Sequence, residues 1–448
     1  MSTLLTKPIA GQDDKLLACI HCGLCLEACP TYVITGDEND GPRGRLYLMR
    51  AVGEGRLASN SSAFERHIDR CLGCRACEQV CPAGVEYGQL LEAARGELFA
   101  SGPPRGLTYS VLRLVLKHVW LHPARLRFAF TLARLGRDSS LARMLRRSGI
   151  ARVFSKRSEF ALALLESSAK SIQPEKQVRI KQQVEAIPAT SPGGSTLLFT
   201  GCVGAGLFAR VNEATRRVLE VNGFAVQTPA EQVCCGALHA HAGDLEGART
   251  LARKNIAAFD AQENAPVITN AGGCGAMLVS YGHLLDDDSA FAERARQFSA
   301  RVRDVSQQLE TVNIKQAACA GERSVTYDAS CHLLYGQHAG EAPLKIVGAI
   351  PGLAFVSLPG SERCCGGAGI YNLLEPDLSS QVLAEKLVNV RATGARVLAT
   401  GNPGCQMQIG AGALLAGMEL DVCHPVELLD EAYAGAGLYE KSGSRVTP

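Results

Sequence analysis

Two copies of one cysteine pattern restrict what this chain can fold into more than any other feature. They span residues 19–30 and 71–82, and each reads Cys-x2-Cys-x2-Cys-x3-Cys-Pro. Three thiols at this spacing can come from one tight turn, while the fourth, before a proline, points away from it. A single zinc ion takes four ligands and would leave the doubling unexplained. The spacing therefore predicts two [4Fe-4S] clusters bound by cysteine thiolates.

The fourth cysteine of each run is expected to serve the other run's cluster, as in two-cluster ferredoxins. This rule predicts a first cluster on Cys19, Cys22, Cys25 and Cys81. It predicts a second cluster on Cys71, Cys74, Cys77 and Cys29. Such a crossing would fasten the two runs together in one domain.

The composition is that of a globular protein with room for two or three domains. The chain has 448 residues, of which 46% are hydrophobic and 20% charged, and its formal net charge is +2. Its 18 cysteines follow no secretory signal, since residues 1–10 contain no apolar core after a basic start. Disulfide scaffolds belong mainly to small secreted domains, so we expect a cytoplasmic protein whose thiols bind metal. No run of 18 apolar residues free of charge predicts a membrane span.

The segment that carries the two runs is expected to be mostly helical. The runs are separated by 41 residues, Pro30 to Arg70, and residues 44–52 show the apolar spacing of a helix. Residues 87–100 show it again. We therefore predict a two-cluster helical domain over residues 1–100.

A basic segment follows, and it leaves two interpretations open. Residues 105–157 contain 13 Lys or Arg against one acid, Asp138, with apolar side chains at helical spacing. Basic amphipathic helices can lie in a membrane interface or dock a partner. The same apolar stripe can instead pack on its own protein; nucleic acid is a weaker third reading. Residues 170–195 have the composition of a linker, so 101–195 is predicted to be a helical segment plus linker.

The C-terminal half is an internal duplication. Its cysteines recur with offsets of 129, 130, 130 and 131 residues, and a Cys-Cys-Gly lies in each copy. The first copy has Cys202, Cys234, Cys235 and Cys274. The second has Cys331, Cys364, Cys365 and Cys405. Such constant offsets indicate two repeats, which we place at residues 196–312 and 313–448.

Each repeat alternates predicted strands with helices. Strands are expected at 196–200 and 266–270, and at 324–327 and 396–400, with helices at 209–222, 244–259 and 377–393. This alternation predicts an α/β sheet with parallel pairs, in which ligand sites gather at the carboxyl ends of strands. The cysteines fall there, so each set of four is a candidate cluster or metal site, with a redox-active dithiol or no cofactor as alternatives. Cys319 and Cys423 lie outside the pattern and are expected to be ordinary thiols.

The predicted fold class is thus α+β and multidomain. A mostly helical two-cluster ferredoxin domain comes first, then a helical linker, then the duplicated α/β cysteine-rich domain. We find no catalytic triad, nucleotide fingerprint or phosphate loop, and assign no catalytic residue to this chain.

The duplicated half resembles the cysteine-rich domain of heterodisulfide reductases, anaerobic glycerol-3-phosphate dehydrogenases and lactate-utilisation proteins. The whole chain is similar to the iron-sulfur subunits of bacterial glycolate oxidases. The resemblance rests on the motifs at 71–78, 364–373, 401–405 and 424–430. It implies an electron-transfer subunit that works beside FAD-binding subunits oxidising glycolate, and often D-lactate. It also implies that FAD sits on those partners, that quinone or another acceptor receives the electrons, and that the chain lies peripherally on the cytoplasmic face of the inner membrane.

One departure from the heterodisulfide reductase pattern limits what the repeats can bind. There each repeat ends in Cys-x2-Cys, whereas Met277 and Gln408 occupy the second position here. A noncubane cluster that draws on more than four cysteines therefore lacks a ligand in each repeat. Two other functions stay open: a reductase of a disulfide or small acceptor at the Cys-Cys-Gly sites, and a metal-dependent scaffold.

Overall fold

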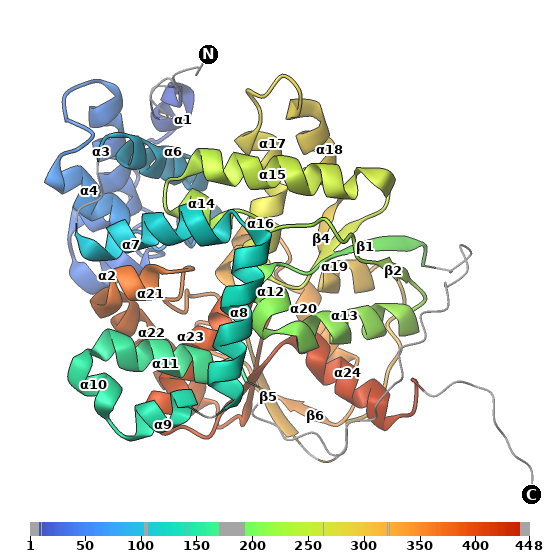
Figure 1. Ribbon diagram of the computed structural model, residues 1–448. Helices are drawn as coiled ribbons and strands as arrows, with labels where there is room; N and C mark the ends of the chain where they lie inside the picture. Colours follow the sequence, from blue (N-terminus) through green and yellow to red (C-terminus); the bar gives the residue numbers. More distant parts are fainter. Residues whose placement is uncertain are drawn as a thin grey trace, which may run out of the picture.

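The computed structural model describes residues 9–439 except 10, 103–105, 140, 170–192, 263, 320 and 322. Figure 1 shows a helical N-terminal part, a group of helices across the front, and two α/β units. This is the predicted α+β multidomain architecture. Most of the predicted linker, residues 170–192, lies outside the described residues.

The N-terminal part contains only helices among its described residues. They are α1 Asp13–Leu17, α2 Pro30–Thr35, η1 Glu38–Asp40, α3 Pro42–Gly53, α4 Ser62–Asp69, α5 Ala76–Gln79 and α6 Tyr87–Ala100. The helices predicted at 44–52 and 87–100 are confirmed as α3 and α6. Proline stands at the first turn of α2 and α3, where no amide hydrogen is needed. Met49, Phe64 and Leu90 form part of a core between these helices.

The basic segment forms a run of helices. They are α7 Leu107–Val115, η2 Leu116–Trp120, α8 Pro123–Asp138, α9 Leu141–Arg147, α10 Ile150–Phe154 and α11 Lys156–Ser167. Part of their apolar surface packs internally: Leu116 and Leu126 are buried, and Trp120 meets Phe130 edge to face with ring centroids 6.0 Å apart. Another part stays exposed, including Leu107 on α7. Internal packing therefore accounts for only part of the predicted stripe.

The first repeat is built around a four-stranded parallel sheet in the order β2-β1-β3-β4. Its elements are β1 Ser195–Phe199, α12 Cys202–Leu207, α13 Ala209–Val221, β2 Ala225–Gln227, α14 Ala237–His241, α15 Leu245–Phe259, η3 Asp260–Gln262, β3 Val267–Thr269, α16 Gly272–Val279, α17 Tyr281–Leu284, α18 Ala292–Arg301, β4 Val302–Asp304 and α19 Val305–Leu309. The two predicted strands are β1 and β3, at the sheet centre. The edge strands β2 and β4 are three residues each and were not predicted.

The second repeat has the same topology, with order β6-β5-β7-β8 and all pairs parallel. Its elements are β5 Arg323–Asp328, η4 His332–Gly336, α20 Ala342–Gly348, β6 Leu353–Phe355, α21 Tyr371–Leu374, α22 Pro376–Ala392, β7 Val397–Thr400, α23 Pro403–Leu415, β8 Asp421–Cys423 and α24 Pro425–Gly435. Equivalent strands pair in equivalent register: Leu197 lies opposite Val267, and Val325 opposite Val397. Two sheets of one topology are the expected product of the duplication.

The two repeats pack on each other and on the N-terminal part. Helices α13 and α24 are joined by ion pairs of Arg210 with Glu427 at 2.8 Å and Arg217 with Asp430 at 2.6 Å. Gly243, which follows α14, lies against the backbone of Arg95 in α6, where an added Cβ would come 2.1 Å from the carbonyl oxygen. Among the described residues, no helix is both long and apolar enough to cross a bilayer.

Candidate metal centres

The two N-terminal cysteine runs follow the same backbone path. His21 and Gly73 occupy equivalent positions with φ of 56° and 63°, and Gly23 and Arg75 occupy the next equivalent pair with φ of 86° and 64°. Two left-handed residues within each run bend the chain around its three leading thiols. The loops therefore present those thiols in the same way.

Two cavities collect the eight cysteines in crossed sets. One cavity is lined by Cys19, Cys22, Cys25 and Cys81. A second, on the other side of Tyr87, is lined by Cys29, Cys71, Cys74 and Cys77. Cys77 also reaches the wall of the first cavity, and Tyr87 reaches both. Each cavity thus receives three thiols from one run and the fourth from the other.

The donor set of these cavities fits a soft polynuclear group. Burial raises the pKa of Cys74 and Cys77 well above the usual thiol value, so these thiols ionise only against a bound cation. A single zinc ion with Zn–S bonds of about 2.3 Å would hold its sulfurs within about 4 Å of one another. Among the described residues, no three cysteine sulfurs all lie within 4.8 Å of each other. The spacing is therefore wider than a one-metal shell requires.

A buried arginine stands beside the second cavity. Arg45 is 0% exposed; its Nη1 lies 3.9 Å from the Sγ of Cys29 and its Nε donates to the carbonyl of His67 at 2.6 Å. The Tyr87 hydroxyl donates to the Sγ of Cys71 at 3.6 Å. Both contacts stabilise negative charge on sulfur. Arg43 instead pairs with Glu38, and Arg50 pairs with Glu54 on the surface.

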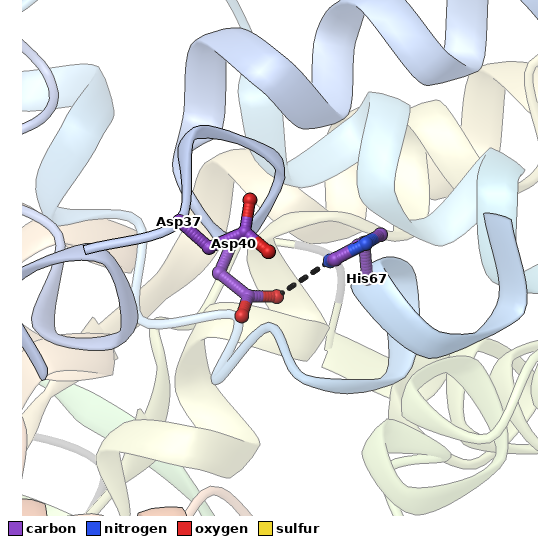
Figure 2. A group of neighbouring side chains, drawn as sticks. All are labelled: Asp37, Asp40 and His67. Carbon is purple, nitrogen blue, oxygen red and sulfur yellow. Dashed lines mark hydrogen bonds and ion pairs between the residues drawn. The ribbon is translucent and has the colours of Figure 1, made fainter. Parts of the chain in front are cut away.

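Asp40 completes the charge network under Arg45. His67 Nδ1 and Arg70 Nη1 each lie 2.8 Å from its carboxylate, and Figure 2 shows the His67 ring directed at it. Burial alone would raise the pKa of Asp40, but His67 and the two arginines hold it below its usual value. With Asp37, these residues form the one cluster of three closely spaced metal-ligating side chains in the described part of the chain. The two guanidinium groups already neutralise the carboxylate, so we assign no metal here.

Each C-terminal repeat brings its four predicted cysteines together. In the first, the Sγ atoms of Cys202 and Cys234 are 3.5 Å apart, and hydrogen bonds continue from Cys234 to Cys235 and from Cys235 to Cys274. In the second, Cys331 contacts Cys364, Cys364 contacts Cys365, and the Sγ atoms of Cys365 and Cys405 are 3.3 Å apart. All four thiols of the second repeat are buried. The sulfurs lie in a row at the carboxyl ends of the central strands.

The glycine of each Cys-Cys-Gly has a conformational reason. Gly236 and Gly366 have φ of +90° and +82°, a region that side chains disfavour. Each also lies against the following long helix: an added Cβ would come 3.3 Å from Ala248 in α15, and 2.7 Å from the carbonyl of Ser379 in α22. A glycine is therefore needed to turn the paired thiols into the site.

The two repeats differ in the polar groups behind the thiols. In the second, Lys386 and Asp328 form a fully buried ion pair at 2.8 Å. Although burial alone would lower it, Asp328 raises the pKa of Lys386, and the thiols of Cys365 and Cys364 add to this. The equivalent positions in the first repeat are Asn255 and Phe199. Asn255 instead donates to the Cys234 carbonyl at 3.0 Å, so only the second site has a buried ion pair.

The second repeat also adjoins the second cluster run. Leu72 shares a core with Cys331 and Cys364, and Cys74 packs against it. Burial, followed by the nearby Cys364, raises the pKa of Cys74, so the two sulfurs are electrostatic neighbours. Tyr371 in α21 donates from its hydroxyl to the carbonyl of Arg70 at 2.9 Å. A site in the second repeat therefore lies next to the second N-terminal cavity.

Comparison with known proteins agrees with this organisation. A family described as the 4Fe-4S dicluster domain matches residues 18–85, and one described as the Cysteine-rich domain matches residues 196–279 and 325–410. The probable glycolate oxidase iron-sulfur subunit of Bacillus subtilis (strain 168) is 39% identical over 428 residues, which is 94% of this chain and 95% of the relative. The glycolate oxidase iron-sulfur subunit of Escherichia coli (strain K12) is 32% identical over 94% of this chain and 95% of the relative.

The chain belongs to the glycolate oxidase iron-sulfur subunit family. Within this family, its N-terminal part is the 4Fe-4S dicluster domain, so [4Fe-4S] clusters are its cofactors. The lactate utilization protein A of Exiguobacterium sp. is 31% identical over only 52% of this chain but 96% of that relative. The match thus covers about half of the present chain.

Several side chains around the sites were not predicted from the sequence. Arg45 was considered only as one of three arginines near the runs, and nothing in its spacing separates it from Arg43 or Arg50. Lys386 and Asp328 lie 58 residues apart and carry no motif. Aligning the two repeats would have marked them, because both positions change from uncharged to charged between the copies.

Proposed function

We propose that this chain is the electron-transfer subunit of a complex that oxidises glycolate. It receives electrons from an FAD-binding partner subunit, which oxidises glycolate or a related 2-hydroxy acid such as D-lactate, and passes them toward a quinone. The printed names of its full-length relatives support this role. The observation that carries the proposal is the pair of crossed cysteine cavities.

We assign the first cluster to Cys19, Cys22, Cys25 and Cys81, and the second to Cys29, Cys71, Cys74 and Cys77. A [4Fe-4S] cluster exchanges one electron at a time, whereas a reduced flavin holds two. The chain's own residues bury the thiols, hold them in crossed sets, and place Arg45 and the Tyr87 hydroxyl against the second set. The second set lies deeper, since Cys29, Cys71 and Cys77 are buried while Cys22 is exposed. Electrons therefore enter best at the first cavity.

We propose a further metal or cluster site at Cys331, Cys364, Cys365 and Cys405. Its four buried thiols, its ion pair of Lys386 with Asp328 and its contact with Cys74 support this assignment. For Cys202, Cys234, Cys235 and Cys274 the support is weaker: their thiols converge, but no buried charge accompanies them in the described residues. The burial of the second set also disfavours direct reduction of a large disulfide substrate there.

We propose that helices α7 and α8 contact the cytoplasmic surface of a membrane. Leu107, Val111 and Leu114 are exposed along one side of α7, and Phe128, Leu132 and Leu135 along one side of α8. Both triplets follow the i, i+4, i+7 spacing of a single helix face, and both helices lie at the front of Figure 1. The arginines and lysine of this segment would attract anionic lipid headgroups.

The proposal is tested by anaerobic affinity purification of the chain from its native membrane fraction. The expected result is co-purification of FAD-containing subunits, and reduction of the iron-sulfur chromophore when glycolate or D-lactate is added. A Cys74→Ser variant should still assemble but lose reducible iron, while Cys319→Ser, outside every set, should not. Purification without flavin subunits, with no response to either acid, would contradict the proposal. Thiol-dependent turnover by the isolated chain would favour a reductase instead.

A further inference from the structure

A large cavity separate from both N-terminal cluster cavities lies where the dicluster domain, α7 and the two repeats meet. It encloses about 1350 Å³ of open space, including its mouth. Its walls come from α4, α6, α7, α14 and the start of α21. Ligand sites commonly form where domains meet, in pockets that are mainly apolar with a few placed polar groups. No residue of the proposed cluster sets lines it.

The lining has two kinds of surface. Leu98, Phe99, Leu112, Ile370 and Leu374 provide apolar walls. Arg95, Tyr109, His241 and Tyr371 provide hydrogen-bonding groups. The hydroxyl of Tyr109 is hydrogen bonded to Asp69. A flat, mostly apolar ring with polar atoms at its edge suits such a lining.

Short contacts connect this cavity to both neighbouring cysteine sets. Arg95 Nη2 donates to the carbonyl of Cys71 at 2.7 Å. On the other side, the His241 ring lies 5.6 Å from that of His332, whose Nδ1 is 3.6 Å from the Sγ of Cys331. A molecule in the cavity would therefore sit between the second cluster run and the second-repeat site.

Helix α7 links the cavity to the outer surface. Tyr109, Leu112 and Arg113 line the cavity, while Leu107, Val111 and Leu114 on the same helix are exposed. One wall of the cavity is thus the back of an apolar outer face. An acceptor with a long hydrocarbon tail could leave that tail along this face while its head group occupies the cavity.

We propose that this cavity binds the quinone that receives the electrons. The inference rests on the proposed function, because the electrons come from the 2-hydroxy acid through the partner flavin and the cysteine-bound clusters. Two electrons and two protons convert both ring carbonyls of the quinone to hydroxyls, giving the quinol. The protons come from water at the polar side of the cavity, where Tyr109 and Asp69 lie.

The test uses the full-length chain, purified anaerobically with its iron, and an azido-benzoquinone with a ten-carbon tail as the probe. Light should attach it to peptides from α6, α7 or residues 368–374, and excess unlabelled decylquinone should prevent this. Leu112→Trp fills the cavity and should lower labelling at least tenfold. Leu114→Trp, on the exposed side of the same helix, should leave labelling unchanged. Tyr109→Phe, which removes one hydroxyl, should weaken decylquinone competition several-fold.

Iron content and thermal midpoint report whether each variant has folded. Should Leu112→Trp unfold, Tyr109→Phe carries the test. Labelling at other peptides, or equal labelling of the wild-type and Leu112→Trp proteins, would overturn the inference. Labelling of the cavity in a protein whose clusters glycolate or D-lactate cannot reduce would retain the quinone site and reject the proposed function. Cluster reduction by these acids without cavity labelling would do the reverse.

Discussion

Single buried side chains set the environment of each cysteine group. Arg45 places a positive charge beside Cys29, and Lys386 places one behind Cys364 and Cys365. His424, at the start of α24, is buried and accepts a hydrogen bond from the amide of Val426 at 3.1 Å. Burial lowers the pKa of His424 to about 3. These groups are held in one charge state by the fold, and they give residue-level tests.

His424 predicts that stability falls as pH decreases. In the unfolded chain it takes up a proton near pH 6.5, whereas in the folded chain it stays neutral to about pH 3. Unfolding therefore gains protons below pH 6.5, and about 1 kcal/mol of stability should be lost between pH 7.5 and 5.5. His424→Asn, which can still cap the helix, should reduce this loss in thermal melts at the two pH values. His338→Asn, at an exposed position, should keep the wild-type pH dependence; equal pH dependence in all three proteins would contradict the prediction.

The glycines of the two Cys-Cys-Gly motifs predict unequal costs of substitution. Alanine at either position places a side chain at positive φ, which costs about 1 kcal/mol or more. At Gly366 the added Cβ would also come 2.7 Å from the Ser379 carbonyl, whereas at Gly236 the nearest atoms are 3.3 Å away. Gly366→Ala should therefore lower the thermal midpoint more than Gly236→Ala. A larger effect at Gly236 would show that the Ser379 contact is readily relieved.

At the scale of elements, the crossed runs make the N-terminal helices depend on one another. Cys29 lies directly before α2, and Cys81 lies two residues after α5. Each therefore carries a helix terminus to the thiols of the other run, and the Asp40 network ties η1, α3 and α4 together beneath them. Loss of one ligand should affect one cluster, and which cluster it affects depends on the crossing.

Paired cysteine substitutions test the crossing. Cys19→Ser with Cys81→Ser removes two ligands of the first set and should cost about four iron atoms per chain, no more than either single change. Cys19→Ser with Cys29→Ser removes one ligand from each set and should cost about eight. Iron analysis of anaerobically purified protein, with electron paramagnetic resonance of the reduced form, provides the measurement. The opposite ranking of the two double variants would mean that each run binds its own cluster.

At the scale of the molecule, the dicluster domain is wedged against both repeats. Gly243 allows the first repeat to touch α6, and Tyr371 brings the second repeat to the residue before Cys71. These contacts enclose the large cavity and bring Cys74 close to Cys364. Relative placement of the three parts is thus needed for any path between their cysteine groups.

Gly243→Ala should loosen this assembly. Its Cβ would overlap the Arg95 carbonyl, in addition to the cost of positive φ. Gly394→Ala is the matched control, because Gly394 also has positive φ but no atom within 4 Å of an added Cβ. We expect Gly243→Ala to raise hydrogen exchange in α6 and α14 and to lower the thermal midpoint further than the control does. Similar exchange in both variants would show that the interface tolerates the extra atom.

The sequence by itself determined the elements and the ligands. Thiol spacing predicted the crossed sets Cys19 to Cys81, offsets of 129 to 131 predicted two repeats, and apolar periodicity predicted α3, α6 and the central strands β1, β3, β5 and β7. These signals are local, because a turn, a helix face or a buried strand is written in neighbouring residues. The three-residue edge strands were too short to show such a pattern.

Only the tertiary structure decided which distant groups meet. It buried Arg45 and left Arg50 exposed, although both lie on α3. It also paired Lys386 with Asp328, packed the second repeat against the Cys74 loop, and divided α7 between a cavity wall and an exposed face. Such pairings depend on packing between segments far apart in the chain, and the energy that favours them appears only once those segments exclude water from each other.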